Sequence, residues 1–517
     1  MKSSHFRCSL SFLLLLLLAA CTRTWGGEQP WVPPAAQGAV KNPTNVIGIA
    51  PPVESLPSVK PFTPATRVAG EPISTPTPDV VKVLPTPRTD EITYAVQPGD
   101  TIGIIAQRFG VDSTALIQYN ELVNPNLLEV GQVLRIPPVS QADPGPAFKI
   151  IPDSELVNGP SAVMNIGETI ARAGGYLSVY HETVDETWYS GADIVRRISL
   201  EYSVNPRILL AVLDYQSGWV STSSPAERTL DYPMGEVNIA RKGLYRQLAF
   251  AANNLNMGYY LWELNALSTI NLADGKSIPL NPGINAGTAG VQYLMAQLYG
   301  QSDWERAVNE NGVYAAYTRL FSYPFDYTFE PLLPPGLTQP EFQLPFELGA
   351  VWSFTGGPHG GWAEGSAWAA LDFAPPGDAL GCVQSNAWTV AIADGVIVRS
   401  ENGEVVQDLD GDGFEQTGWT ILYMHMETRD RVQVGDFVRA GERIGHPSCE
   451  GGYSNGTHMH LARRYNGVWI AADGNLPFIL DGWVSSGDGI EYNGYLTKDG
   501  SVVEAWDSRV PENQISR

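Results

Sequence analysis

Cysteine, histidine and basic side chains are all scarce in this chain of 517 residues, and the shortage of basic residues excludes one class of partner. Only 32 lysines and arginines stand against 55 acidic residues, which gives a formal net charge of −23. No basic stripe is available to neutralise phosphates, so we predict no nucleic-acid partner. Beyond residue 20 the sequence has no apolar run long enough to predict a membrane-spanning helix. The length allows several domains, each with its own core.

The first 21 residues have the pattern of an export signal. Lys2 and Arg7 supply positive charge, and Leu10 to Ala20 is an apolar run too short for a stable anchor. Leu18 to Cys21 resembles a bacterial lipobox, in which the cysteine becomes the first mature residue and carries lipid. The resemblance implies lipidation of Cys21 and an exported protein, lipid-anchored to the membrane and facing the cell wall. The alternative is an ordinary secretory signal.

Four cysteines are present, and two of them belong to this N-terminal segment. Cys8 lies in the export signal and Cys21 in the lipobox, which leaves Cys382 and Cys449. In an oxidising compartment such a remaining pair is most simply a disulfide. A cysteine zinc site is the alternative, but the sequence lacks the C-x-x-C spacing of such sites.

Five of the seven histidines fall in the last third of the chain, and four of them, all but His446, stand in motifs together with one distinctive aspartate. His458 and His460 are two residues apart, so on a strand both rings project from the same face. Asp372 stands between Leu371 and Phe373, so its carboxylate faces away from two apolar neighbours.

The other two histidines of this group lie farther apart in the sequence. His359 ends the fragment Gly356-Gly357-Pro358-His359. Ile421, Tyr423 and His425 are expected to share one face of a strand. Two neutral imidazoles and one carboxylate, with a fourth position left to water, are what a catalytic zinc site needs. Two further imidazoles then remain for proton transfer and transition-state contacts.

The order His…Asp…His…His-x-His resembles that of the zinc endopeptidases of the lysostaphin, LytM and beta-lytic type, which cut peptide cross-links in bacterial cell walls. The resemblance covers about residues 345–475 and implies an all-β domain with an antiparallel sheet. It implies that His359, Asp372 and His460 hold zinc. His425 and His458 would act on the catalytic water and the tetrahedral intermediate, and which of them is the general base stays open. Lysostaphin-like members have three residues between the first His and the Asp, whereas this chain has twelve, as in the beta-lytic branch.

The region before these motifs divides into a linker and a small domain. Residues 22–90 are rich in Pro, Thr, Val and Ala and are expected to form a disordered tether. Residues 91–138 show a β-α-α-β order and resemble a LysM domain, a small α+β unit that binds N-acetylglucosamine-containing glycan in a shallow groove between two loops. The residues expected at this groove are Gly99, Asp100, Thr101, Ile102, Asn126 and Leu127.

Residues 160–335 are expected to be mostly helical. Apolar spacings of three and four predict helices over 192–200, 205–215, 244–260 and 287–300. Asn205 to Trp219 resembles the catalytic helix end of lysozyme-like lytic transglycosylases, in which a Glu protonates the glycosidic oxygen. Gln216 occupies that position and cannot act as an acid. We therefore expect a lysozyme-like domain without that activity, and leave open a substrate-holding role or a helical spacer.

Two further segments have distinct patterns. Asp408, Asp410 and Asp412 begin like a calcium loop, but the usual bidentate Glu is missing, so a Ca²⁺-braced loop and a solvated acidic turn both remain open. Residues 476–517 are expected to form a C-terminal β extension, with Asp499-Gly500 as the turn of a hairpin.

Together these segments predict a multidomain cell-wall (peptidoglycan) zinc endopeptidase that hydrolyses peptide bonds in the stem or cross-bridge. The LysM unit would hold it on glycan and raise the local substrate concentration. The predicted cofactors are zinc and, at the acidic loop, calcium; the predicted partners are peptidoglycan and, through the lipid anchor, the membrane. Two alternatives remain: a non-catalytic wall-binding activator of another hydrolase, and a glycan-cleaving lytic transglycosylase.

Overall fold

The computed structural model describes residues 62–64, 81–82, 90–97, 100–122, 124–125, 127–138 and 143–517. The predicted export signal with Cys21 and most of the predicted tether lie outside the described residues, and so do Gly99 and Asn126. Within the described part of the chain, every helix is too short or too polar to cross a membrane.

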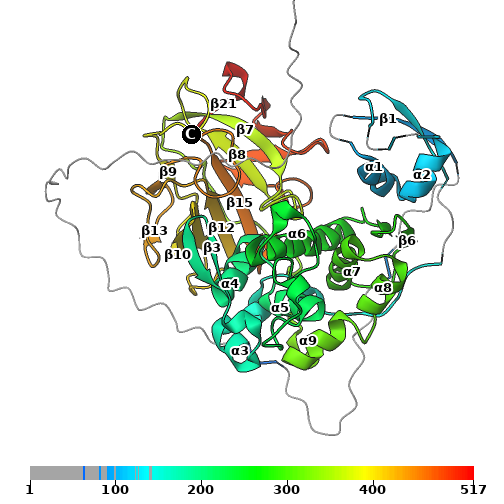
Figure 1. The fold of residues 1–517 in the computed structure, drawn as a ribbon. Coiled ribbons are helices and arrows are strands. Elements are labelled where there is room, and N and C mark those ends of the chain that lie inside the picture. Colours follow the sequence, from blue (N-terminus) through cyan, green and yellow to red (C-terminus); the bar gives the residue numbers. More distant parts are fainter. Residues whose placement is uncertain are drawn as a thin grey trace, which may run out of the picture. The chain divides into compact units, whose positions relative to one another are not determined.

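The first folded unit has the predicted β-α-α-β order (Figure 1). Its strands, β1 (Ile92–Ala95) and β2 (Val133–Ile136), pair in antiparallel register and are joined through helices α1 (Ile102–Phe109) and α2 (Ser113–Tyr119). Asp112 caps α2 by accepting a hydrogen bond from the backbone N–H of Ala115, at 2.6 Å. A small apolar core closes the unit and includes Ile105, Leu116, Leu134 and Ile136.

The second region is mostly helical. Its helices are α3 (Ile166–Ala173), α4 (Gly191–Tyr202), α5 (Pro206–Ser217), α6 (Leu244–Glu263), α7 (Ala286–Leu298), α8 (Gln301–Ala307) and α9 (Val313–Phe321). Two hairpins interrupt them, β3 (His181–Val184) with β4 (Thr187–Ser190) and β5 (Thr269–Asn271) with β6 (Ser277–Pro279). The four predicted helices correspond to α4, α5, α6 and α7, and are confirmed. Helix α5 is buried from Pro206 to Asp214 and ends at Gly218, whose left-handed φ of 69° favours glycine.

The third region is built on an antiparallel sheet of nine strands within residues 351–516, which confirms the predicted all-β, antiparallel domain (Figure 1). The strand order is β13-β10-β11-β12-β15-β8-β7-β21, with β16 paired to β15. The bounds are β7 (Val351–His359), β8 (Ala370–Ala374), β10 (Gly395–Glu401), β11 (Glu404–Asp408), β12 (Trp419–Met424), β13 (Phe437–Val438), β15 (Met459–Tyr465), β16 (Val468–Trp469) and β21 (Gln514–Ser516). Strands β9 (Thr389–Val390) and β14 (Arg443–Gly445) pair separately.

Both faces of this sheet are buried, and they face different partners. One face, with Phe373, Tyr423 and Leu461, packs into the core of the β domain itself. The next residues along the same strands, among them Leu422 and Ala462, belong instead to the apolar core formed by the helices. Side chains alternate between the two faces of a strand, so the helical region and the sheet share one continuous core.

The C-terminal residues add to the β domain. Strands β17 (Ile479–Leu480), β18 (Trp483–Ser486), β19 (Tyr495–Lys498) and β20 (Ser501–Glu504) form a four-stranded antiparallel sheet. The β19–β20 hairpin turns at Asp499-Gly500, both with positive φ, as predicted. Strand β21 then pairs with β7, so the end of the chain completes the edge of the large sheet.

Cys382 and Cys449 form the predicted disulfide, which spans a sequence separation of 67 residues. Loop 375–388 and the segment after His446 are further joined by a hydrogen bond from the N–H of Thr457 to the carbonyl of Gly381, 3.1 Å long. The pairing excludes the alternative of a cysteine zinc site.

We predict that Cys382→Ser lowers the free energy of unfolding by about 2–5 kcal/mol, because the disulfide restricts the unfolded chain across a long loop. Denaturant unfolding of the mature protein, with and without reductant, measures the loss. Reductant should destabilise the parent and leave Cys382→Ser unchanged. Two free thiols in the unreduced parent protein would contradict the pairing.

Candidate metal centre and the residues around it

Three side chains that are far apart in the sequence bring their donor atoms together at one end of the sheet. His359 Nε2 lies 3.0 Å from His460 Nδ1 and 3.3 Å from Asp372 Oδ1, and the last two atoms are 3.2 Å apart. All three residues are buried. Asp372 and His460 are directly paired across β8 and β15, and Gly356 of β7 pairs with Asp372 from the other side. Adjacent strands therefore fix the positions of two of the three donors.

This donor set fits a tetrahedral zinc ion. Ligand bonds of 2.0–2.1 Å in a tetrahedron require donors about 3.3 Å apart, close to the separations found here. Asp372 Oδ1 is buried and has no hydrogen-bond donor, which leaves its lone pairs for a cation. The outward nitrogens, His359 Nδ1 and His460 Nε2, lie 2.8 and 3.1 Å from the carbonyls of Gly357 and Gly361. Such contacts orient metal-ligating imidazoles and fix their tautomers.

Local backbone features make room for this arrangement. Strand β7 shifts register twice against β8, between Phe354 and Gly356 and between Gly356 and His359. A side chain at Gly356 would place its Cβ 2.7 Å from Asp372 Oδ2, so glycine is required for the carboxylate to fit. The irregularity of β7 thus carries His359 to the same cluster as the paired Asp372 and His460.

His425 and His458 lie beside the three donors, but the face predicted for His425 was wrong. Ile421 and Tyr423 point into the core of the β domain, and β12 ends at Met424. His425 has φ 63°, a left-handed conformation that turns its ring to the metal side of the sheet. Its ring centroid lies 4.5 Å from that of His458. The Nδ1 atoms of the two rings contact the carbonyls of Glu450 and Gly456, at 3.0 and 2.8 Å.

The electrostatics of the cluster favour an ionised Asp372 carboxylate, and the rings respond differently: burial lowers the pKa of His460, whereas at His359 burial is outweighed by Asp372, which raises the pKa of that ring. Burial opposes ionisation of Asp372, but the adjacent His359 and His458 outweigh it and hold the pKa of the carboxyl well below its usual range. Burial, together with His458 and His460, lowers the pKa of His425 to about 3, so this ring is neutral at neutral pH. An anionic carboxylate and neutral imidazoles are the ligand states that zinc binding requires.

Sequence analysis missed Tyr492, which belongs to the C-terminal β extension. Its ring stacks on His359, with centroids 4.2 Å apart and planes at 19°. Its backbone also bonds to the two residues that precede His359. The N–H of Gly357 donates to the carbonyl of Tyr492, and the N–H of Tyr492 donates to the carbonyl of Pro358. Nothing in the local sequence around Tyr492 indicates a contact with a residue more than 130 positions earlier.

The remaining predicted site residues lie in other parts of the fold. In the LysM unit, Ile102 is buried in the core, and Asp100 accepts hydrogen bonds from Tyr94 Oη and the N–H of Gln97. Thr101 and Leu127 are exposed. Side-chain oxygens of Asp408, Asp410 and Asp412 lie within 4.8 Å of one another. This spacing is compatible with a Ca²⁺-braced loop and with a solvated acidic turn, so both stay predictions.

Three segments of the chain match models of known protein families. The LasA N-terminal domain model matches residues 149–333, the LysM domain model residues 94–137, and the peptidase family M23 model residues 382–472. The chain therefore contains a LysM domain, a LasA N-terminal domain and an M23 peptidase domain. The predicted LysM domain is confirmed, whereas a lysozyme-like fold for the helical region stays a prediction. The M23 match begins at residue 382, so the predicted ligands His359 and Asp372 lie outside the matched segment.

Curated relatives match parts of the chain. Protease LasA of Pseudomonas aeruginosa is 27% identical over 296 residues in strain UCBPP-PA14 and 28% identical over 296 residues in strain PAO1. These matches cover 53% of this chain and 66% of each relative, so the chain spans slightly under two thirds of their length. The N-acetylmuramoyl-L-alanine amidase XlyA of Bacillus subtilis is 43% identical over 61 residues, 12% of this chain and 20% of that protein.

Solved structures resemble part of the chain. The M23 metalloprotease pseudoalterin from the deep sea is 24% identical, with a TM-score of 0.27, and the match covers 33% of this chain and 96% of that chain. The catalytic domain of lysostaphin from Staphylococcus simulans is 26% identical, with a TM-score of 0.18, and the match covers 23% of this chain and 87% of that chain. At such TM-scores neither similarity supports a conclusion about the fold or function of this chain.

We predict that the folded protein binds one zinc ion per chain and that His460→Ala and Asp372→Ala abolish this stoichiometric binding. Elemental analysis after dialysis against trace zinc measures the occupancy. His181→Ala is the matched control, because His181 is exposed and stacks on Trp188 of the β3–β4 hairpin, within the helical region. A folded parent protein without zinc would contradict the assignment of the three ligands.

Proposed function

We propose that this protein is a peptidoglycan endopeptidase that uses zinc held by His359, Asp372 and His460. The main support for this proposal is that the three donor atoms lie 3.0–3.3 Å apart, beside two further imidazoles. The M23 and LysM matches support a substrate in the bacterial cell wall. Zinc at this site would supply a Lewis acid for the hydrolysis of a peptide bond.

The two imidazoles outside the ligand set have the geometry for proton transfer. In each, Nδ1 faces a backbone carbonyl and therefore carries the proton, which leaves Nε2 as the free nitrogen. His458 Nε2 lies 3.7 Å from Asp372 Oδ2, so this nitrogen borders the ligand carboxylate directly. One ring would accept the proton of the attacking water at Nε2, and the other would contact the developing oxyanion.

The rest of the chain fits a tethered wall enzyme. The LysM domain would bind N-acetylglucosamine-containing glycan, and lipidation of Cys21 would hold the exported protein on the membrane through the 22–90 tether. Both arrangements raise the local concentration of cross-linked peptide without a new contact at the reacting centre.

In the helical region, a glutamine stands at the position where the resemblance to lytic transglycosylases expects the catalytic acid. This residue, Gln216, accepts a hydrogen bond from Tyr299 Oη at 2.5 Å. The nearby Asp214 is buried and held by Arg319 at 2.6 Å and by Ser221. These contacts occupy both oxygens of Asp214, which therefore does not take the place of the missing acid. This argues against the transglycosylase alternative.

We predict new peptide ends and no new glycan ends when the purified protein digests peptidoglycan, because the metal centre acts on peptide bonds and Gln216 cannot protonate a glycosidic oxygen. Mass spectrometry of the released muropeptides measures both. The absence of any product would favour the non-catalytic activator, and new glycan ends would favour the transglycosylase.

We further predict that retention on peptidoglycan and cleavage of peptide bonds depend on different domains. Deletion of residues 91–138 should weaken retention on insoluble peptidoglycan, yet leave cleavage of a small soluble peptide nearly unchanged. His458→Ala should abolish that cleavage and leave retention intact, and Gln216→Ala should alter neither. Cosedimentation and peptide hydrolysis measure the two properties. Loss of soluble-peptide cleavage on deletion of the LysM domain, or parental cleavage by His458→Ala, would refute this division.

A further inference from the structure

The loop between the first two zinc ligands contacts the helical region. Residues 360–369 follow His359 and precede β8, which carries Asp372. At the tip of this loop, the N–H of Gly365 donates a hydrogen bond of 2.8 Å to the side-chain oxygen of Asn253 on α6. A Cβ at Gly365 would lie 2.0 Å from the backbone carbonyl of Asn253, so only glycine permits this close approach.

Two tryptophans make further contacts between this part of the β domain and the helices. Trp362, in the same loop, packs edge-to-face on Tyr202 at the end of α4, with ring centroids 6.1 Å apart. Trp469 of β16 donates from Nε1 to the carbonyl of Tyr202, at 3.3 Å, and from its backbone N–H to Tyr260 Oη, at 3.0 Å. The loop and β16 are therefore both held by α4 and α6.

The loop held by these contacts bonds directly to the zinc ligand His460. Gly361 lies between the two tryptophans, and a Cβ on it would be 2.6 Å from the ring of Trp469. The carbonyl of Gly361 accepts the hydrogen bond from His460 Nε2, the outward nitrogen of the ligand ring. The position of Gly361 thus sets the orientation of His460, and the helical region sets the position of Gly361.

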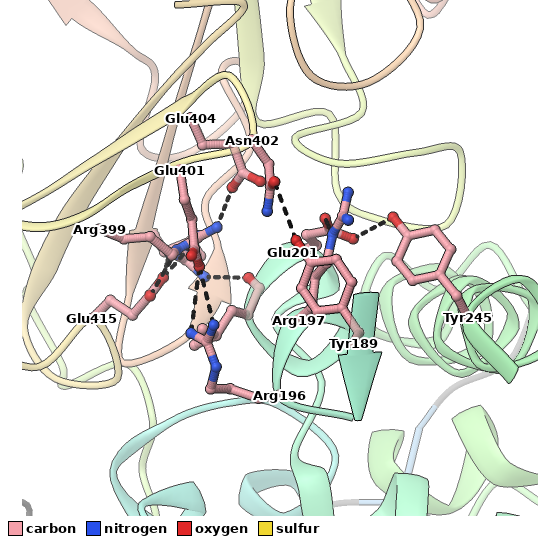
Figure 2. Close-up of polar contacts among 12 residues, drawn as sticks. Tyr189, Arg196, Arg197, Glu201, Tyr245, Arg399, Glu401, Asn402, Glu404 and Glu415 are labelled. Carbon is pink, nitrogen blue, oxygen red and sulfur yellow. Dashed lines mark hydrogen bonds and ion pairs between the residues drawn. The ribbon is translucent and has the colours of Figure 1, made fainter. Parts of the chain in front are cut away.

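Polar contacts also join α4 and the β3–β4 hairpin to the sheet (Figure 2). Arg399 of β10 is buried between Glu404 and Glu415, and Arg196 of α4 forms an ion pair with Glu401, at 3.3 Å. Tyr189 donates to the side-chain oxygen of Asn402, at 3.4 Å. Arg399, Glu404 and Glu415 all belong to the β domain, and the Arg196–Glu401 pair that crosses the interface is solvent-accessible, so it adds little to the hold of α4 on the sheet. The shared apolar core is what keeps the helices against the sheet and beneath the loop.

We infer that the helical region is a positioning element of the zinc centre: through Asn253 and Tyr202 it holds loop 360–369, whose Gly361 carbonyl orients the ligand His460. This inference rests on the proposed function only in that the three ligands bind zinc. It assigns the region a role that neither a helical spacer nor a glycan-holding domain would have. The positioning residues touch no ligand themselves.

The test compares neighbouring asparagines of α6. Asn253→Ala removes the acceptor of the Gly365 hydrogen bond, whereas Asn254→Ala removes only a bond to the carbonyl of Phe250 in the same helix. Zinc affinity is measured by chelator competition, and ligand geometry by the visible absorption of the Co²⁺ form. We expect Asn253→Ala to weaken zinc binding about tenfold, the lower end of the range for outer-shell groups, and to shift the Co²⁺ spectrum.

Asn254→Ala should match the parent in both measurements, and Asn253→Asp, which keeps an oxygen acceptor, should restore both. Tyr202→Leu, which removes the aromatic ring that Trp362 packs on, is the second variant, and a smaller change in the same direction is expected. Parental zinc affinity and Co²⁺ spectra in both Asn253→Ala and Tyr202→Leu would overturn the inference. A parent that binds no zinc overturns it as well, whereas a parent that binds zinc but cleaves no peptide overturns only the proposed function.

Discussion

The burial of both faces of the antiparallel sheet is the constraint on which the rest of the structure depends. Side chains alternate along each strand, so Leu371, Phe373 and Leu461 fill the core of the β domain while Ala370 and Ala462 meet the helices. Asp372 and His460 occupy this second face, one pleat from the alanines. The candidate metal centre therefore lies at the margin of the face that the helices cover, and the alternation that packs the two regions together also places the ligands beside their boundary.

The boundary itself combines apolar packing with buried charge. Arg399 is buried, with Glu404 and Glu415 as its partners, and Arg464 bonds both Glu415 and the carbonyl of Leu200 on α4. Burial raises the pKa of Glu404 to about 7 even though Arg399 favours its charged form. Such pairs contribute little net stability, but breaking one leaves an uncompensated buried charge. Arg464 is the member of this network that contacts α4, and it thereby joins that helix to the buried charges of the sheet.

Sequence patterns predicted the parts of this structure that depend on local order and on residue type. The apolar spacing of α4 to α7, the His-x-His pair, the isolated Asp372 and the single remaining cysteine pair all appear where they were expected. Contacts that depend on the tertiary fold could not be predicted in this way. The left-handed φ of His425 reverses the face that strand alternation assigns to it. Tyr492 stacks on His359, more than 130 residues earlier, and Asn253 bonds to Gly365 in the loop between two ligands, 112 residues later; neither has a motif of its own.

The four imidazoles of the site show why such distant segments matter. A carbonyl can only accept, so the ring nitrogen that faces it carries the proton. His359, His425 and His458 each turn Nδ1 to a carbonyl, while His460 turns Nε2, and the opposite nitrogen of every ring is left as a lone pair.

Distant parts of the fold act on these carbonyls. Tyr492 of the C-terminal extension fixes Gly357 by accepting its N–H, and the segment joined by the disulfide carries Glu450, which faces His425, and Gly456, which faces His458. Gly361 faces His460 and lies in loop 360–369, which contacts the helices at Gly365 and Trp362. The tautomers and orientations of the rings therefore depend on segments outside the strands that place the ligand side chains, and loop 360–369 connects the metal centre to the helical region.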